Sequence, residues 1–283
     1  MAKYDVDKLA KTANEIRRNT VKSLLEAGSG HSAGSLGLAD ILTALYFSIM
    51  ENDPEKPDWG ERDRLFVSNG HIAPALYATL AQAGYFPVKE LATLRKFDSR
   101  LQGHPERGKL PGIESTSGPL GEGLAQAAGY AYAARMDNKR FRIFCITSDG
   151  EHNEGSHWEA VLFAAKYNLS NLTVFVDRNN IQIDGHTEDV MPLEPLQEKY
   201  RSFGWHVLHI DGHNFDEIIG AVNHARAVYE DPTVIIAHTI PGKGVSFMEN
   251  LPEWHGNAPT KSEAKKALNE LRSLGGKIQG EHE

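Results

Sequence analysis

Two polar turns follow two apolar runs near the middle of the chain, and their residue types could bind a metal ion. Asp149 follows the apolar run 141–147, and Asn179 follows a second run, 172–176. Such runs are typical of buried strands in a parallel sheet, where a right-handed crossover places both carboxyl ends on one edge. Open α/β sheets bind ligands at that edge. We therefore expect Asp149 and Asn179 to face the same ligand.

Few kinds of ligand suit the pair formed by Asp149 and Asn179. One carboxylate, one side-chain amide oxygen and a nearby backbone carbonyl form an incomplete set of hard oxygen ligands. Mg²⁺ suits such a set because it keeps water and takes its remaining ligands from a phosphate. A helix that starts near Glu154 would add backbone N–H groups and a positive dipole end. The two turns therefore predict a site for a metal ion and a diphosphate.

These motifs resemble those of thiamine diphosphate enzymes, and those of transketolase most closely. Ser148-Asp149-Gly150 followed by Asn179 is similar to the cofactor fingerprint of these enzymes, a Gly-Asp-Gly with a later Asn. Serine stands at 148 where the family usually has glycine. The Glu154-Gly155 pair, Glu159 and the Ile-Asp-Gly segment 183–185 favour transketolase over the other members.

The resemblance implies the cofactors and the residues that hold them. The expected cofactors are thiamine diphosphate and Mg²⁺ or Ca²⁺. The implied metal ligands are Asp149, Asn179 and the Ile181 carbonyl. The implied cofactor contacts are His71, Gly118, Pro119, Leu120, Asp149, Gly150, Asn179, Ile181 and His255. Glycines in the segment 117–123 would let its backbone approach the cofactor closely.

Four histidines lie in segments that are similar to transketolase motifs. His31 belongs to a loop that keeps the family's histidine, leucine and glycine but lacks its two prolines. His71 ends a Ser-Asn-Gly-His turn directly after a predicted strand, and His104 lies in a Gly-His-Pro-Glu segment. His255 precedes a glycine, with one residue inserted before the following Ala-Pro. The alternative for His71 is a surface or capping histidine, and that for His104 is a solvent-exposed loop histidine.

The resemblance also implies roles for these histidines and for two glutamates. His31, His104 and His255 would bind substrate hydroxyls and help to move protons, which suits imidazole near neutral pH. Glu154 and Glu159 would lie at a subunit interface and link two sites; their alternative is a solvated helix face. The other histidines are expected in the core or on the surface, and they include His152, His157, His206, His209 and His238.

The composition is that of an ordinary globular protein with a substantial core. The chain has 283 residues, of which 40% are hydrophobic and 24% charged. Its formal charge of −8 argues against nucleic acid as a partner. No apolar stretch predicts a membrane span or a signal peptide, and the single cysteine, Cys145, is expected to be a packed thiol in a reducing compartment. We therefore expect a cytoplasmic protein.

Apolar periodicity predicts the elements around the motifs. Strands are expected over 64–67, 141–147, 172–176, 205–212 and 233–239. Helices are expected over 6–27, 38–50, 73–84, 89–97, 124–136, 214–229 and 261–274. Asn214 should cap its helix, with Glu217 three residues on. The stretch 98–119 is irregular, and such segments are usually functional or disordered. With the resemblance, these elements imply an α/β thiamine diphosphate-binding fold, with a mostly parallel sheet and helices on both faces.

The resemblance implies that the chain is half of an enzyme. Residues 1–283 are expected to form a single diphosphate-binding domain with an N-terminal helix and a C-terminal helical tail, of which 275–283 would be frayed. Transketolases bind the cofactor between this domain and a second one, which supplies a glutamate to the aminopyrimidine. No motif here matches that glutamate. The expected protein is the N-terminal subunit of a split transketolase, paired with a C-terminal subunit in a heterotetramer with two copies of each.

The implied reaction transfers a two-carbon ketol unit from a ketose phosphate to an aldose phosphate. It would serve the pentose phosphate pathway or a dedicated route for unusual sugars. Two alternatives remain. The first is the α subunit of a thiamine-dependent 2-oxo acid dehydrogenase or a deoxyxylulose-phosphate-type synthase. The second is a non-catalytic homologue that binds the cofactor or a partner and regulates it.

Overall fold

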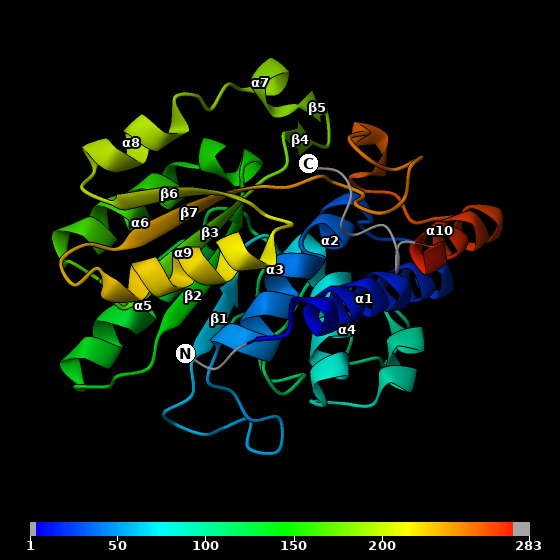
Figure 1. Ribbon diagram of the computed structural model, residues 1–283, viewed down its shortest axis with the longest axis horizontal. Coiled ribbons are helices and arrows are strands. Elements are labelled where there is room, and N and C mark those ends of the chain that lie inside the picture. Colours follow the sequence, from blue (N-terminus) through cyan, green and yellow to red (C-terminus); the bar gives the residue numbers. More distant parts are fainter. Residues whose placement is uncertain (1–3, 274–283) are drawn as a thin grey trace.

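A five-stranded parallel sheet forms the centre of the protein, in the order β1-β2-β3-β7-β6 (Figure 1). The computed structural model describes residues 4–273. The strands of the sheet are β1 (Arg64–Val67), β2 (Ile143–Ser148), β3 (Leu172–Arg178), β6 (His206–Asp211) and β7 (Thr233–His238). The predicted α/β fold with a mostly parallel sheet is therefore confirmed, and all five predicted strands are present.

Helices cover both faces of the sheet because apolar side chains alternate along each strand. On β2, Phe144 and Ile146 belong to a core shared with four helices: α1 (Val6–Ala27), α3 (Ala39–Ala44), α4 (Ala73–Ala83) and α9 (Phe215–Ala227). Ile143 and Cys145 belong to a second core, shared with α5 (Gly123–Met136), α6 (Gly155–Lys166) and α8 (Leu196–Ser202). The Cys145 thiol is fully buried, as expected, and burial raises its pKa.

Side-chain caps begin two of the predicted helices. Asp5 accepts a hydrogen bond from the Lys8 N–H at the start of α1, and Gly28 ends this helix with a φ of 67°. The left-handed value favours glycine at this position. Asn214 accepts from the N–H groups of Asp216 and Glu217 at the start of α9. The predicted cap is thus confirmed.

The chain departs from the predicted helices in two places. The region 38–50 folds as α3 followed by a π-helical turn, Leu45–Ile49, and α2 (Ala33–Gly37) precedes it. The helix expected over 89–97 was wrong. A 3-10 helix, Val88–Thr93, takes its place, and Arg95 then adopts a φ of 58°, which the right-handed helix cannot include. The Arg95 N–H bonds instead to the Leu101 carbonyl at 2.9 Å.

Several short elements were not predicted because their segments are polar or carry no clear period. These are β4 (Ile181–Gln182), β5 (Gly185–His186), α7 (Thr187–Val190), α8 and three 3-10 turns at Gly70–Ile72, Gly150–Asn153 and Pro252–Trp254. The last helix, α10 (Lys261–Ser273), packs beside α1 through a third apolar cluster (Figure 1). The predicted tail 275–283 lies outside the described residues. Within residues 4–273, no helix has the length and apolarity needed to cross a membrane.

Candidate active site

The carboxyl ends of the central strands meet around one buried carboxylate, Glu151. Its oxygens accept hydrogen bonds from the Ser148 N–H at 2.8 Å, from the Gly121 N–H at 3.1 Å and from the Ser68 hydroxyl. Ser68 follows β1, Ser148 ends β2, and Gly121 lies just before α5. Burial raises the pKa of Glu151, and these donors oppose the rise. Glu151 thereby fixes the relative positions of three ligand-facing segments.

The two oxygens of Asp149 have different surroundings. Oδ2 accepts from the Asn180 N–H at 2.7 Å, from Arg178 Nη1 at 3.1 Å and from the Thr187 hydroxyl at 3.4 Å. Oδ1 accepts from the Gly150 N–H at 2.8 Å. The carboxyl is fully buried, which raises its pKa, while Arg178 and the two amides oppose that rise. The more lightly bonded oxygen, Oδ1, is the one suited to a metal ion.

Asn179 is oriented by its neighbours. Its Nδ2 donates to Asp177 Oδ2 at 2.8 Å, so its Oδ1 faces the turn, where it accepts from the Ile181 N–H at 3.0 Å. Asp177 is held in turn by the Thr239 hydroxyl, and burial raises the pKa of Asp177 to about 7. Such outer contacts are what orient metal ligands in proteins. The carbonyl-type oxygen of Asn179 is thus presented rather than its amide nitrogen.

The structure places the three predicted metal ligands in adjoining segments. Both chain neighbours of Asn179, namely Arg178 and Asn180, donate to Asp149, and Ile181 begins β4 directly afterwards. Residues 4–273 hold no group of three His, Cys, Asp or Glu side chains that could bind a metal. A metal at this edge therefore depends on amide and carbonyl oxygens, which is the mixed set that suits Mg²⁺ or Ca²⁺.

The four predicted histidines converge from four separate segments. The ring centroid of His31 lies 5.3 Å from that of His71, 6.0 Å from that of His104 and 5.7 Å from that of His255. The His71 and His255 centroids are 5.1 Å apart. Because Gly34 and Gly256 lie against the His71 and His31 rings, small residues make this approach possible. Helices or long loops separate these histidines in the sequence, so only the fold assembles them.

Burial keeps these imidazoles neutral. It lowers the pKa of His31 to about 4 with help from the charges of His255, His104 and Arg95. Burial followed by the neighbouring histidines lowers the pKa of His71 well below its usual value. The pKa of His104 is lowered by burial and then by Arg95, and that of His255 by burial. A neutral imidazole offers one N–H donor and one acceptor nitrogen, which is what proton transfer requires.

The segment 117–121 packs directly against the turn that carries His71. A Cβ added to Gly70 would lie 2.6 Å from the Ser117 hydroxyl oxygen and 3.0 Å from the Gly118 nitrogen. Gly118 itself has a φ of 151°. Leu120 is partly exposed, at 37%. The predicted cofactor-contacting backbone at Gly118 therefore adjoins the histidine cluster.

Several buried polar atoms around this segment have no hydrogen-bond partner within residues 4–273. They are both side-chain polar atoms of Asn69, the Ser117 hydroxyl and His31 Nδ1. Buried polar groups are normally paired, so unpaired ones call for a ligand. Their position, beside the imidazoles and the segment 117–121, fits a polar cofactor. This is the observation on which the fit of thiamine diphosphate rests.

Glu154 and Glu159 lie on the outer side of the site. Glu154 directly precedes α6, and a Cβ added to Gly121 would lie 2.6 Å from the Glu154 Cβ. Both glutamates are exposed in the isolated chain. Within residues 4–273, neither glutamate forms a hydrogen bond or an ion pair with any of the four clustered histidines. Their predicted position at a subunit interface therefore stays a prediction.

The five histidines that were expected in the core or on the surface lie there. His152 and His157 are buried, and each places Nε2 2.8 Å from the Tyr200 hydroxyl. His209 and His238 stack on each other with centroids 5.4 Å apart at an exposed edge, and His206 is half-buried. These positions agree with the expected core or surface placement.

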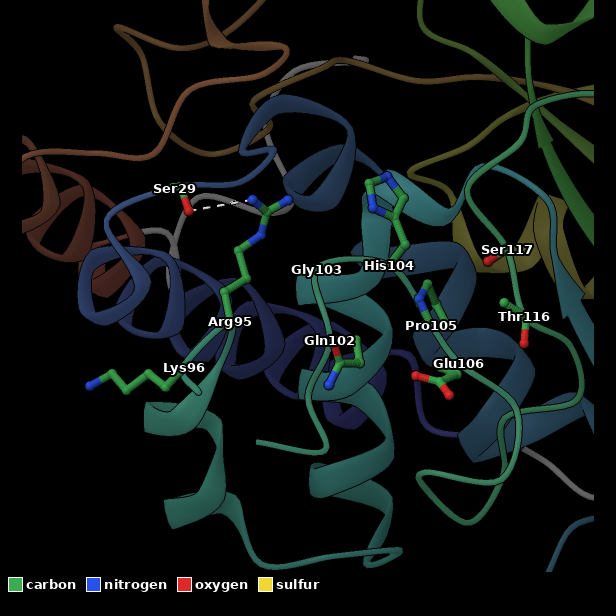
Figure 2. Close-up of a pocket in the computed structure, with 10 residues that line it drawn as sticks. All are labelled: Ser29, Arg95, Lys96, Gln102, Gly103, His104, Pro105, Glu106, Thr116 and Ser117. Atoms are coloured by element: carbon green, nitrogen blue, oxygen red, sulfur yellow. Dashed lines mark hydrogen bonds between the residues drawn. The ribbon is translucent and has the colours of Figure 1, made fainter. Parts of the chain in front are cut away.

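Three residues with roles at the site were not singled out from the sequence. Glu151 and Arg178 are buried charges in the two turns that carry the predicted metal ligands, and Arg95 lines the pocket beside His104 (Figure 2). A signal existed for the first two, because each is a charged residue inside or directly after a buried apolar strand. Such charges are almost never buried unless paired.

The chain matches a family model over residues 8–275, described as "Transketolase, thiamine diphosphate binding domain". It is 45% identical to a 6-deoxy-6-sulfo-D-fructose transketolase subunit of Clostridium sp. (strain MSTE9), with 97% of this chain and 100% of the relative covered. It is 38% identical to one of the apulose-4-phosphate transketolase subunits of Phocaeicola vulgatus, with 98% of each covered.

Solved structures agree with the sequence relatives. A transketolase from Campylobacter jejuni superposes with a TM-score of 0.89 at 32% identity, covering 95% of this chain and 43% of that chain. Human transketolase is 36% identical, with 94% of this chain and 42% of the relative covered. This chain therefore spans less than half the length of these longer transketolases. On its fold and its sequence, the chain belongs to the transketolase family, whose thiamine diphosphate binding domain it contains.

Proposed function

We propose that this chain is the N-terminal, diphosphate-binding subunit of a two-chain transketolase. The support is that the Clostridium and Phocaeicola relatives, whose whole length the chain matches, are themselves named as subunits. The chain would act as a single domain and pair with a C-terminal subunit, two copies of each. That partner would supply the glutamate for the aminopyrimidine of the cofactor.

The proposed reaction moves a two-carbon ketol unit from a ketose to an aldose. Thiamine diphosphate, when bound, supplies the carbanion chemistry that breaks and remakes the carbon–carbon bond. Asp149, Asn179 and the Ile181 carbonyl would hold Mg²⁺ or Ca²⁺ against its diphosphate. Gly118, Pro119, Leu120 and Gly150 would contact it through their backbone, and His71 and His255 through their rings.

The histidine cluster carries the proposal. His31, His104 and His255 lie close enough together to reach neighbouring hydroxyls of one sugar, since the His31 centroid is 6.0 Å from that of His104 and 5.7 Å from that of His255. Each neutral ring can accept a proton from a substrate hydroxyl and return it. The unpaired Nδ1 of His31 is available for such a contact.

The proposed substrates are ketoses and aldoses that end in an anionic group. The named substrates of the two subunit relatives end in a sulfonate and a phosphate, respectively. Glu154 and Glu159 are exposed, and Glu154 lies beside Gly121. Both would meet the neighbouring copy in the assembly and link its site to this one. The exposed face would thus become an interface in the assembled enzyme.

The test is a ketol-transfer assay on this chain alone and after co-expression with its C-terminal partner. Xylulose 5-phosphate and ribose 5-phosphate serve as donor and acceptor, with thiamine diphosphate and Mg²⁺. Activity in the pair and not in the single chain is expected, because the aminopyrimidine glutamate would come from the partner. A second donor series, fructose 6-phosphate and 6-deoxy-6-sulfofructose, extends the test to the sugars suggested by the relatives.

Two outcomes would replace the proposal. Turnover of pyruvate and none of any ketose would point to the 2-oxo acid dehydrogenase or deoxyxylulose-phosphate-type reaction. Cofactor binding by the pair without turnover of any donor would point to a regulatory homologue. The His31, His71 and His104 motifs favour ketol transfer over both.

A further inference from the structure

A pocket of about 700 Å³ opens beside the histidine cluster. It is lined by Arg95 and Lys96, by two segments of the irregular stretch, 102–106 and 116–117, and by Ser29 of the loop before His31. Figure 2 shows the Arg95 and His104 side chains extending in the same direction from separate segments, with the Arg95 guanidinium toward Ser29 and Glu106 beyond His104. The pocket therefore joins the imidazoles to a basic side chain.

Arg95 is the basic side chain of the pocket lining that has no carboxylate partner among the described residues. Its Nη1 donates to the Ser29 hydroxyl at 3.3 Å, and within residues 4–273 its guanidinium has no carboxylate partner. Lys96 instead pairs with Glu26 at 3.8 Å and points away from the pocket in Figure 2. Glu106, the acidic residue of the lining, pairs with Lys109 at 3.9 Å. A guanidinium has five N–H donors, so most of those on Arg95 remain available.

The backbone fixes the place of this guanidinium. Arg95 has a left-handed φ of 58°, a value that costs free energy for a residue other than glycine. A Cβ on Gly103 would lie 3.0 Å from Arg95 Nε and Cζ, and one on Gly30 3.8 Å from Nε. The guanidinium thus packs tightly against Gly103, where a larger residue would push it aside, and it is in ordinary contact range of Gly30. A strained residue held this way is often a functional one.

The guanidinium also lies close to the reacting end of the site. The charge of Arg95 is among the causes that lower the pKa of His31 and of His104. His104 and Ser117 line the same pocket, and Ser117 precedes the cofactor-contacting Gly118. A sugar with its carbonyl at the imidazoles would therefore extend its far end toward Arg95.

We propose that Arg95, with the Ser29 hydroxyl, forms a subsite for the terminal oxyanion of the substrate. The inference rests on the proposed ketol transfer and assigns a residue of this chain to substrate selection. Phosphate and sulfonate share the required chemistry, a tetrahedral group with several acceptor oxygens that a planar guanidinium can engage with two N–H groups. Arg95 thus selects sugars with an anionic end over neutral ones.

Arg95→Gln tests this in the assembled pair. The substrates are fructose 6-phosphate, 6-deoxy-6-sulfofructose and the neutral ketose erythrulose, each with the same neutral acceptor, D-glyceraldehyde, so that every donor gives a product that differs from it. The kcat/KM for both anionic donors should fall about 10- to 100-fold, mainly through KM, because a charge-assisted hydrogen bond is lost. The value for erythrulose should stay unchanged. A larger fall for the phosphate ester than for the sulfonate would identify phosphate as the better-fitting anion.

Lys89→Gln is the matched control, because it removes an exposed positive charge of the 3-10 helix Val88–Thr93 that does not line the pocket. It should leave the anionic and neutral values alike unchanged. Equal losses on erythrulose and on the anionic donors in Arg95→Gln would overturn the proposal and assign Arg95 a purely structural role. Unchanged selectivity in Arg95→Gln would also overturn it.

A binding measurement separates this inference from the proposed function. Calorimetry on the cofactor-loaded pair compares ribose 5-phosphate with ribose, without any turnover. The wild type should bind the phosphate ester more tightly, and Arg95→Gln should lose about 10- to 100-fold of that difference. If this holds while no ketose is turned over, the subsite stands and the proposed reaction fails. If the pair transfers ketol units and the difference persists in Arg95→Gln, the subsite fails alone.

Discussion

The Arg178 guanidinium lies 3.1 Å from Asp149 Oδ2, and it leaves Oδ1 of the same carboxyl with one backbone amide. Arg178 also donates to Glu188 at 2.6 Å and to Glu194 at 3.0 Å, so its positive charge is shared among three carboxylates. The charge of the Arg178 guanidinium is therefore already balanced by carboxylates, and it does not oppose a metal ion at Asp149 Oδ1. Arg178 acts as a positioning residue that holds Asp149 by one oxygen and presents the other.

Arg178→Met should destabilise the metal-free protein by about 3–5 kcal/mol, because it leaves the buried Asp149 without its ion-pair partner. Adding Mg²⁺ and thiamine diphosphate should raise the free energy of unfolding more in the variant than in the wild type, since the metal replaces the lost positive charge. Urea denaturation with and without both ligands measures this. Glu188→Gln, at a half-exposed partner of Arg178, should change stability by about 0–1 kcal/mol. An equally small loss of stability in Arg178→Met would show that the ion pair between Arg178 and Asp149 does not stabilise the fold.

Asp149→Asn should weaken thiamine diphosphate binding in Mg²⁺ by about 100-fold or more, since even the loss of an outer-shell partner weakens a metal site 10- to 100-fold. Calorimetry measures the affinity, and circular dichroism checks that the variant is folded. The control is Asp189→Asn, at an exposed carboxyl of α7, which should bind as the wild type does. Unchanged affinity in Asp149→Asn would mean that Asp149 is not a metal ligand.

The buried histidines should make the protein less stable in acid. The pKa of His31 is lowered from 6.5 to about 4, and that of His71 is lowered well below its usual value. Between 6.5 and the lowered pKa of His31 the unfolded chain binds protons that the folded chain does not, so the contribution of His31 to stability falls as the pH drops from 6.5 toward 4. His152 and His157 act in the same direction. Asp177, whose pKa is raised to about 7, contributes in the opposite direction over this range, so the effect of the histidines is read from the difference between variants.

Urea denaturation measures how steeply the free energy of unfolding changes with pH. The range runs from about pH 7.5 to about pH 4.5, because the usual and the lowered pKa of His31 lie within it. His31→Asn should make the slope shallower than in the wild type. His186→Asn, at an exposed histidine, should leave it as it is. An unchanged slope in His31→Asn would show that this imidazole titrates normally in the folded protein.

Glu151→Ala should lower the free energy of unfolding by about 1–3 kcal/mol for each backbone N–H that loses its acceptor. The two amides are those of Ser148 and Gly121. Glu151→Gln keeps one acceptor oxygen and should lose less. Chemical denaturation compares both with Glu159→Gln, at an exposed position, which should change stability by less than about 0.5 kcal/mol. Equal stability of all three would contradict the role of Glu151 as the link between strand ends.

Much of the fold was predictable because its strands are buried apolar runs with polar turns at their carboxyl ends. From the sequence, this pattern already assigned Asp149 and Asn179 to one edge of the sheet. The helix expected over 89–97 was wrong for a local reason: Arg95 adopts a left-handed φ, which no periodicity reveals. The hairpin of β4 and β5 was missed because its four paired residues carry no alternation of apolar and polar side chains.

The ion pairs and the pocket could not be predicted because they depend on residues that are distant in sequence or buried against expectation. Ser29 and Arg95 are brought together only by the loops after α1 and after the 3-10 helix Val88–Thr93. Arg178 ends a strand that continues two residues beyond its apolar run, which takes a charge into the buried sheet edge. A charge next to an apolar run indicates that Arg178 needs a partner, but hydropathy patterns do not name that partner, and they give no sign of the contact between Ser29 and Arg95.

The central claim is that this chain and a partner subunit together transfer an intact two-carbon unit. The most direct measurement uses a ketose donor labelled with ¹³C at both C1 and C2, with ribose 5-phosphate as acceptor, and follows the product by ¹³C NMR. The account predicts adjacent, coupled labels in the product from the pair, and none from either chain alone or from a pair that carries Asp149→Asn. Label that appears singly, or equal transfer by the Asp149→Asn pair, would contradict it.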